Sequence, residues 1–262
     1  MKAVILGAGV WGNDESFPPS VLVDAGGELI LFDCGEGIRF RIFEGGYDVT
    51  DIEHVAITET HPDHYALIQL YQAMHCKGFS SDRRGKKLFL YVPQQLKDKW
   101  KDVWNCYLPE LEGKFEYEFP KLKWNVMKNG SNKNINDKLK LTSYGAKHAF
   151  GRVETLIYRL ECDGKIFAYV GDSGPCEGLA NAARNADLFI CEASCMVGEK
   201  NHEYGHLNPR EVGEAANNAG VKHLVVTHYF GLESDDAIMK DVKRSGFRGK
   251  VTVAKDLMEF AI

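Results

Sequence analysis

The first third of the chain alternates short apolar runs with turns rich in glycine, proline and aspartate. Runs of four or five residues dominated by Val, Ile, Leu and Ala, when bounded by such turns, are typical of buried strands. They predict strands over residues 3–6, 21–24, 29–33 and 54–58. Apolar residues at helical spacing predict helices over residues 35–45 and 62–75, the second with Pro62 in its first turn.

The rest of the chain continues this alternation, with one stretch that is harder to assign. A strand over residues 88–92 precedes a helix over 94–106, and the polar run NGSNKNIND within 107–137 predicts a loop tip or the end of a meander. Asp163-Gly164, between strands over 155–162 and 166–170, is a strong hairpin signal. The other predicted elements are strands over 139–144, 188–191, 223–227 and 250–253, and helices over 177–183, 209–219 and 235–243.

This order of elements predicts an α/β fold. Strands come first, and strands that alternate with helices follow, which favours two sheets with helices packed outside them. No internal repeat, low-complexity tract or proline-rich linker marks a boundary. We therefore expect a single domain over residues 1–262.

Composition and charge limit the possible binding partners and cellular compartments of the protein. The 262 residues include 32 basic and 37 acidic side chains, and the net charge of −5 gives no overall attraction to nucleic acid. The seven cysteines form no CxxC pair and are typical of reduced thiols. The N-terminus lacks the pattern of a secretion signal, and no apolar run is long enough to cross a membrane. We expect a cytoplasmic protein.

The sharpest local feature is the septet Thr58-Glu59-Thr60-His61-Pro62-Asp63-His64, where a predicted strand ends and a predicted helix begins. It places four candidate metal ligands within six residues. Donors at such a junction can converge on a cation without distorting either element. Taken alone, the septet is also open to a plainer interpretation, namely a helix start with two surface histidines.

Together with the rest of the chain, the septet resembles the HxHxDH signature of the metallo-β-lactamase superfamily, matched at every ligand position but the first. Further markers of that superfamily occur in the right order. They are Asp33 in LFDCGEG, a lone His148, Asp172 in YVGDS and His228 in LVVTH. Each is weak by itself, since Asp33 could be a simple turn aspartate and either histidine an ordinary polar residue.

The resemblance implies a four-layered αββα sandwich with two divalent metal ions at one edge between the sheets. The implied ligands are Glu59, His61 and His148 for the first metal, Asp63, His64 and His228 for the second, and Asp172 as the bridge. Asp63 is also expected to act in catalysis. Asp33 matches an aspartate that orients a ligating imidazole through its other ring nitrogen.

A more specific likeness is to the tRNase Z branch of the superfamily and its small phosphodiesterase relatives. The opening ILGAGVWGNDES looks like the start of that branch, and Cys191-Glu192-Ala193-Ser194 stands where the branch carries its HEAT tetrapeptide. The likeness implies that His206, in Gly205-His206, is the general acid for the leaving oxygen and that Glu192 orients it. The simpler interpretation is a helix cap, since Asn208-Pro209 suits one.

Glu59 is the main departure from the pattern, because the branch has histidine at that position. If Glu59 ligates, a third carboxylate beside Asp63 and Asp172 hardens the site and shifts its preference from Zn toward Mn or Fe. If Glu59 faces away, the first metal binds weakly. We favour ligation.

The chain also lacks the long basic, glycine-rich arm with which tRNase Z enzymes grip tRNA. The predicted hairpin fills the short stretch between His148 and Asp172, and the one basic cluster is more typical of a solvated loop. That cluster consists of Lys77, Arg83, Arg84, Lys86 and Lys87. Binding of long RNA, which requires several phosphate contacts, is therefore disfavoured.

These features predict a binuclear metal-dependent hydrolase that cleaves a small or nucleotide phosphodiester by attack of a metal-activated hydroxide, with His206 protonating the departing oxygen. Three alternatives stay open at this stage. They are a tRNA 3′-processing endonuclease, a lactone or thioester hydrolase with the same site, and a metal-poor binding protein without catalysis. A homodimer is compatible with the resemblance.

Overall fold

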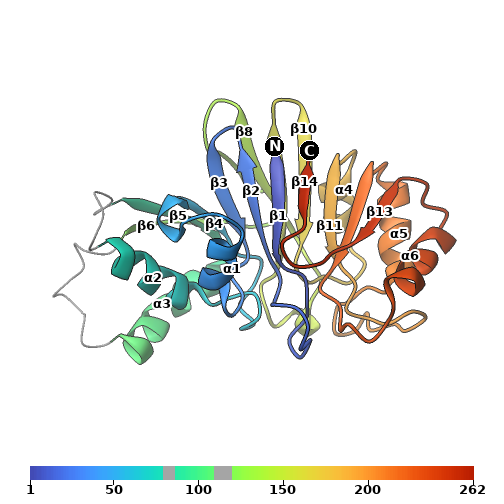
Figure 1. Ribbon diagram of the computed structural model, residues 1–262, viewed down its shortest axis with the longest axis horizontal. Helices are drawn as coiled ribbons and strands as arrows, with labels where there is room; N and C mark the ends of the chain where they lie inside the picture. Colours follow the sequence, from blue (N-terminus) through green and yellow to red (C-terminus); the bar gives the residue numbers. More distant parts are fainter. Residues whose placement is uncertain (79–85, 109–119) are drawn as a thin grey trace.

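The computed structural model describes residues 1–78, 86–108 and 120–262. Within these ranges the strands form two sheets of seven that pack face to face (Figure 1). The first sheet has the strand order β14-β1-β2-β3-β4-β5-β6. Its strands are β1 (Lys2–Gly7), β2 (Ser20–Ala25), β3 (Glu28–Phe32), β4 (His54–Ala56), β5 (Lys87–Val92), β6 (Lys121–Val126) and β14 (Glu259–Ala261).

The second sheet has the order β13-β12-β11-β10-β9-β8-β7. Strands β10 to β13 run parallel to one another, whereas β7 to β10 are joined antiparallel. The strands are β7 (Asn132–Asn134), β8 (Leu139–Gly145), β9 (Leu156–Cys162), β10 (Lys165–Val170), β11 (Leu188–Glu192), β12 (His223–Thr227) and β13 (Lys250–Val253).

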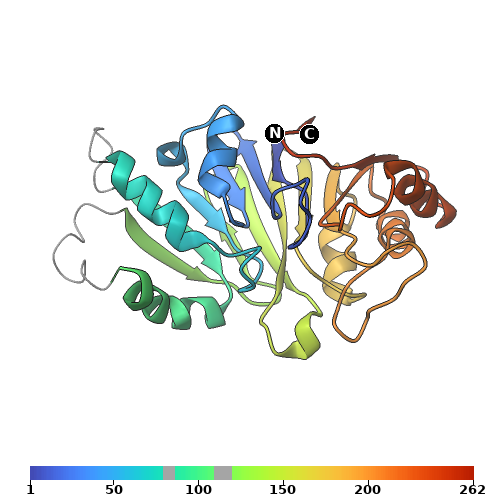
Figure 2. The same cartoon turned by 60° about the horizontal axis from the view of Figure 1, so that its bottom comes forward.

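Helices cover the outer face of each sheet (Figures 1 and 2). The first sheet carries α1 (Ile38–Glu44), α2 (Leu67–Gly78) and α3 (Gln94–Tyr107), and the second carries α4 (Glu177–Ala183), α5 (Pro209–Asn218) and α6 (Asp235–Arg244). Two short 3-10 turns lie in the connections: η1 (Val49–Asp51) between α1 and β4, and η3 (Ala149–Gly151) between β8 and β9. The predicted αββα sandwich is confirmed.

Burial on both faces explains why the strands are continuous apolar runs. In β1, Ala3 and Ile5 belong to the core between the sheets, and Val4 and Leu6 to the core under the helices. Successive side chains of a strand point to opposite faces, so a strand covered on both faces has no polar alternation. At the centre of the core the rings of Phe32 and Phe167 meet, 5.1 Å between centroids.

The hairpin predicted at Asp163-Gly164 is confirmed. Strands β9 and β10 pair antiparallel with Cys162 opposite Lys165. Both turn residues have positive φ, 48° for Asp163 and 74° for Gly164. This is the backbone that a two-residue turn of type I′ requires.

One local prediction is wrong, and one strand was not predicted. The helix predicted over 62–75 begins only at Leu67, because residues 61–64 form a turn closed by the His64 N–H on the His61 carbonyl. The polar run NGSNKNIND contains β7, the exposed edge strand that ends the antiparallel meander of β7 to β10, so the predicted meander end is confirmed. Strand β14 has no counterpart among the predictions, since its three residues carry too little pattern. The single-domain assignment stays a prediction.

Candidate metal centre

The predicted ligands meet where several strands end at one edge of the sandwich. The septet follows β4, Asp172 follows β10, and His228 follows β12. Strands β10, β11 and β12 are parallel, so the segments after them emerge at the same edge of the second sheet. The N–H of Leu156 donates to the Thr58 carbonyl and ties the septet of the first sheet to β9 of the second.

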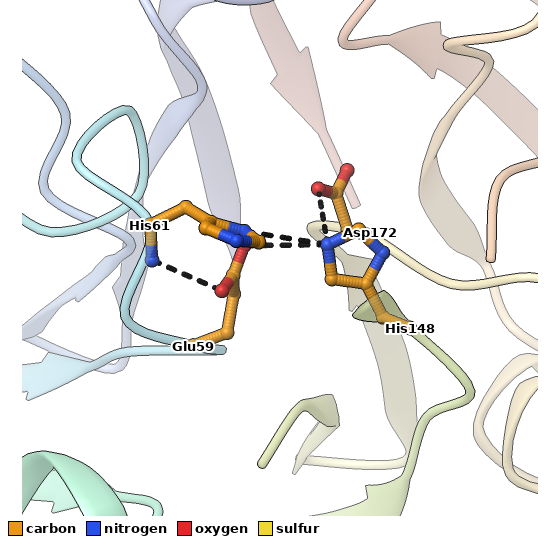
Figure 3. Close-up of side chains that lie close together, drawn as sticks. All are labelled: Glu59, His61, His148 and Asp172. Atoms are coloured by element: carbon orange, nitrogen blue, oxygen red, sulfur yellow. Dashed lines mark hydrogen bonds and ion pairs between the residues drawn. The ribbon is translucent and has the colours of Figure 1, made fainter. Parts of the chain in front are cut away.

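One set of donors, here called the outer group, consists of Glu59, His61 and His148. Together with Asp172, these residues each offer a donor atom within 4.8 Å of the others. His61 Nδ1 lies 2.7 Å from Glu59 Oε1 and 3.3 Å from His148 Nε2, and His148 Nε2 lies 3.3 Å from Asp172 Oδ2. Figure 3 shows the side chains pointing toward one another from the two halves of the site. Glu59 therefore faces the cluster.

The second set, the inner group, consists of Asp63, His64 and His228, whose donor atoms again lie within 4.8 Å of one another. His228 Nε2 lies 3.4 Å from Asp63 Oδ2. Asp172 contacts both sets. Its Oδ2 lies 3.3 Å from His148 Nε2 of the outer group and 3.5 Å from His64 Nε2 of the inner group, and its Oδ1 lies 3.1 Å from His228 Nδ1. This position suits the bridging role that the sequence comparison implied.

Asp33 lies behind the inner group and holds His64. Its Oδ2 accepts from His64 Nδ1 at 2.9 Å and from the Tyr169 hydroxyl at 2.8 Å, while Oδ1 accepts the Thr58 N–H at 2.7 Å. Gly171 is required here, because a Cβ would lie 2.9 Å from the Asp33 carboxylate. Because the Nδ1–H of His64 is hydrogen-bonded to Asp33, its Nε2 faces the site. A carboxylate partner of this kind orients a ligating imidazole.

Ser194 holds the imidazole of His228, as Asp33 holds that of His64. The sequence analysis did not predict this role. The Ser194 hydroxyl donates to the His228 carbonyl at 3.1 Å and lies 2.7 Å from His228 Nδ1, from which it can accept. With Nδ1 held in this way, His228 turns its Nε2 toward Asp63. The only signal was the position of Ser194 at the end of the Cys191-Glu192-Ala193-Ser194 tetrapeptide.

His206 lies beside the cluster and is paired with Glu192. The Glu192 Oε1 accepts from His206 Nδ1 at 3.2 Å, and the same carboxylate is fixed by the N–H groups of Ser173 and Ser194. Burial lowers the pKa of His206, but the hydrogen bond to Glu192 outweighs this and raises it to about 9. The helix-cap interpretation is also correct for its own residues, since Asn208 caps α5 in a capping box.

The cluster keeps its carboxylates ionised. Burial raises the pKa of Asp63, but the hydrogen bond to His228 and the charge of His64 outweigh it and bring the pKa to about 2. Burial acts on Asp172 in the same way, and His228 and His64 hold its pKa well below the usual range. Ionised carboxylates and neutral imidazoles are the forms that bind cations.

These residues fit divalent cations. His64 Nε2 is fully buried and, among the described residues, has no hydrogen-bond partner. A buried polar atom without a partner costs free energy unless something else satisfies it. The donor set combines imidazole nitrogens with carboxylate oxygens from two adjacent groups, which is the chemistry that Zn, Mn and Fe ions bind.

Comparison with known proteins defines the class. The family described as "Beta-lactamase superfamily domain" matches residues 28–229, and the chain therefore belongs to that superfamily. A curated ribonuclease Z of Sulfurisphaera tokodaii is 27% identical over 98% of this chain and 97% of its own length. The structure of the metallo-β-lactamase fold protein YhfI from Bacillus subtilis gives a TM-score of 0.80, with 21% identity over 99% of this chain and 98% of that one.

The structure of human tRNase Z, short form, gives a TM-score of 0.78 with 21% identity over 100% of this chain and 99% of that one. The protein is thus a metal-dependent hydrolase of the metallo-β-lactamase fold with ribonuclease Z relatives. The helices of the described residues include none with the length and apolar character that a bilayer crossing demands.

Proposed function

We propose that the protein hydrolyses a small phosphodiester with two divalent cations, one held by the outer group and one by the inner group, with Asp172 between them. The observation that carries the proposal is the Glu192–His206 pair beside Asp172, whose Oδ1 lies 3.8 Å from His206 Nδ1. Bound cations would acidify a water molecule and neutralise charge on the phosphoryl oxygens. A separate proton donor next to them suits a poor alkoxide leaving group.

The chain's own residues have distinct roles in this proposal. Glu192 holds Nδ1 of His206, so Nε2 is the ring nitrogen that can deliver a proton to the departing oxygen. The His206 side chain is only 14% exposed, and partial exclusion of water strengthens its pairing with Glu192. Asp63 keeps a catalytic assignment besides ligation, since its carboxylate can accept a hydrogen bond from the attacking water.

Replacing His206 tests the proposal. His206→Ala should slow hydrolysis of diesters with alkoxide leaving groups by roughly 100-fold or more, because proton transfer by a positioned side chain contributes about that much. Bis-nitrophenyl phosphate, whose leaving group requires little protonation, should lose far less. Equal losses in kcat/KM on both substrates would contradict the role of His206. A lactone and a thioester in the same panel test the acyl-hydrolase alternative.

A tRNA 3′-processing endonuclease is the second candidate, and the ribonuclease Z relatives that match almost the whole chain favour it. Against it, β9 and β10 with their two-residue turn occupy the stretch in which the resemblance to the tRNase Z branch leads us to expect a long basic arm. Lys77 and Lys86 of the basic cluster pair with Asp48 and Glu53, and Arg83 and Arg84 lie outside the described residues. Cleavage of a precursor tRNA with higher kcat/KM than a dinucleotide would favour this second candidate.

For the metals, we propose that Glu59 is a ligand through a single oxygen. Its Oε2 accepts the N–H groups of Thr60 and His61, both at 3.0 Å, which leaves Oε1 toward the cluster. Three carboxylates in the two groups together favour Mn or Fe over Zn. The homodimer and the cytoplasmic location stay predictions.

A further inference from the structure

Phe150 stands exposed directly beside the proposed metal centre. It follows the ligand candidate His148 by two residues, in the turn η3, and is 63% exposed. The turn that carries it projects in yellow-green at the bottom of the view in Figure 2. A large aromatic ring that stands exposed at the edge of a site offers a flat apolar face to a bound molecule.

The backbone at Phe150 is held in an unfavourable conformation. Ala149 and Phe150 have φ of 47° and 55°, the left-handed region that bulky residues avoid. The Ala149 N–H donates to the Tyr204 carbonyl, and the Gly151 N–H donates to the His148 carbonyl at 2.9 Å. Such strain costs free energy and clusters at functional sites. The turn therefore fixes where the ring of Phe150 stands.

A series of rings connects Phe150 to the proposed acid. Phe150 meets Tyr204 edge-on with 5.3 Å between ring centroids, and Tyr204 lies stacked on His206 at 5.2 Å and 28°. Tyr204 also contacts His148 edge-on at 5.0 Å. The rings thus extend from His206, which faces the departing oxygen, out to solvent at Phe150. A group attached to the departing oxygen would pass along them.

Resting on the proposed phosphodiesterase function, we propose that Phe150, supported by Tyr204, stacks on a nucleobase attached to the leaving-group side of the scissile phosphate. Every nucleobase offers a π-face, and stacking on an aromatic side chain contributes to affinity without requiring a particular base. The preferred substrates are therefore nucleoside phosphodiesters, whether free or at the end of a strand.

The test uses two diesters that share a methyl group on the retained side. One has adenosine as the 5′-leaving group, and the other has the same sugar without a base. The wild type should prefer the adenosine diester in kcat/KM by about 5- to 150-fold, the range that a stacking contact provides. Phe150→Leu should remove this preference by slowing only the adenosine diester, and Phe150→Trp should retain it.

Matched variants separate stacking from damage to the fold. Phe43→Leu makes the same change at a phenylalanine that is 72% exposed on α1, and should alter neither substrate. Phe150→Asn serves if the leucine variant unfolds, because Asn tolerates the left-handed backbone. A preference that survives in Phe150→Leu, or an equal loss on both diesters, would overturn the proposal. A dinucleotide and a longer oligonucleotide, compared afterwards, distinguish a free substrate from a strand end.

A binding readout keeps the inference separate from the proposed function. The nucleotide 2-aminopurine riboside 5′-monophosphate loses fluorescence when its base stacks, so the metal-loaded wild type should quench it. Phe150→Leu should weaken both the quenching and the affinity, the latter by at least about fivefold. If no diester is hydrolysed but this difference is present, the phosphodiesterase proposal fails and the stacking surface stands. Equal quenching by both proteins overturns the stacking proposal.

Discussion

The inner and outer groups offer similar donor atoms but differ in how those atoms are held. In the inner group each imidazole has an Nδ1 partner outside the ligand set, Asp33 for His64 and Ser194 for His228, although His228 Nδ1 also lies 3.1 Å from Asp172 Oδ1. In the outer group His148 has the Gly205 carbonyl at 3.1 Å, whereas His61 turns its Nδ1 to Glu59, itself a ligand candidate. The His61 side chain is 32% exposed and that of His64 is 0% exposed.

Asp33 and Ser194 hold the inner imidazoles from outside the ligand set. His61 and Glu59, both ligand candidates, contact each other directly, so a cation bound by both would compete with that contact. Preorganised ligands lose less freedom on binding. We therefore expect the inner group to hold its metal more tightly.

Graded metal removal gives the largest expected effect. A weak chelator should leave one metal per chain and a strong one none, and activity should fall by roughly a thousandfold or more, since cations supply several kcal/mol of transition-state stabilisation. Metal content and kcat are measured at each step. Simultaneous loss of both metals, at every chelator strength, would contradict the ranking of the two groups.

Asp33→Asn should weaken the inner group specifically. Replacing a partner that orients a ligating imidazole costs about 10- to 100-fold in metal affinity. In this variant the inner group should therefore no longer bind its metal more tightly than the outer group, and both metals should leave at similar chelator strength. Asp241→Asn is the matched control, because Asp241 is a buried carboxylate that pairs with Arg210 and Arg244 and lies outside both groups. If Asp33→Asn binds both metals with the affinities of the wild type, the proposed role of Asp33 in the tighter binding by the inner group is refuted.

Glu59→His should act on the outer group. It restores the residue usual in the tRNase Z branch and removes a carboxylate, so competition between Zn and Mn should shift toward Zn by about tenfold or more. Glu59→Gln, which keeps the shape but cannot ionise, should instead lose the outer metal. Unchanged metal identity and stoichiometry in both variants would show that Glu59 is not a ligand.

Ser194→Ala should give the smallest effect. The variant loses one hydrogen bond to His228, which is worth about 0.5–1.5 kcal/mol, so the affinity of the inner group should drop by about 2- to 12-fold. Ser143→Ala removes a comparable hydroxyl that is also buried and donates to the Lys128 carbonyl, and it should leave metal binding unchanged. If Ser194→Ala and Ser143→Ala bind metals with the same affinity, Ser194 does not contribute to metal binding through His228.

The sequence predicted most of the scaffold, because strands buried on both faces are continuous apolar runs, as in β1 and β12. The resemblance to the superfamily's markers pointed to Asp172 and His228, which lie just after β10 and β12. Prediction from the sequence failed where contacts or length override local pattern: the turn at His61–His64 delays the start of α2, and the three residues of β14 carry too little pattern. The roles of Ser194 and Phe150 depend on neighbours distant in the chain, which no spacing shows.

The most direct test is a crystal structure of the Mn-loaded protein with anomalous scattering from the metal. We expect two peaks roughly 3.5–4 Å apart. One should lie against Glu59, His61 and His148, the other against Asp63, His64 and His228, with Asp172 in contact with both. Peaks elsewhere, or imidazoles of the inner group turned away from any peak, would contradict the account.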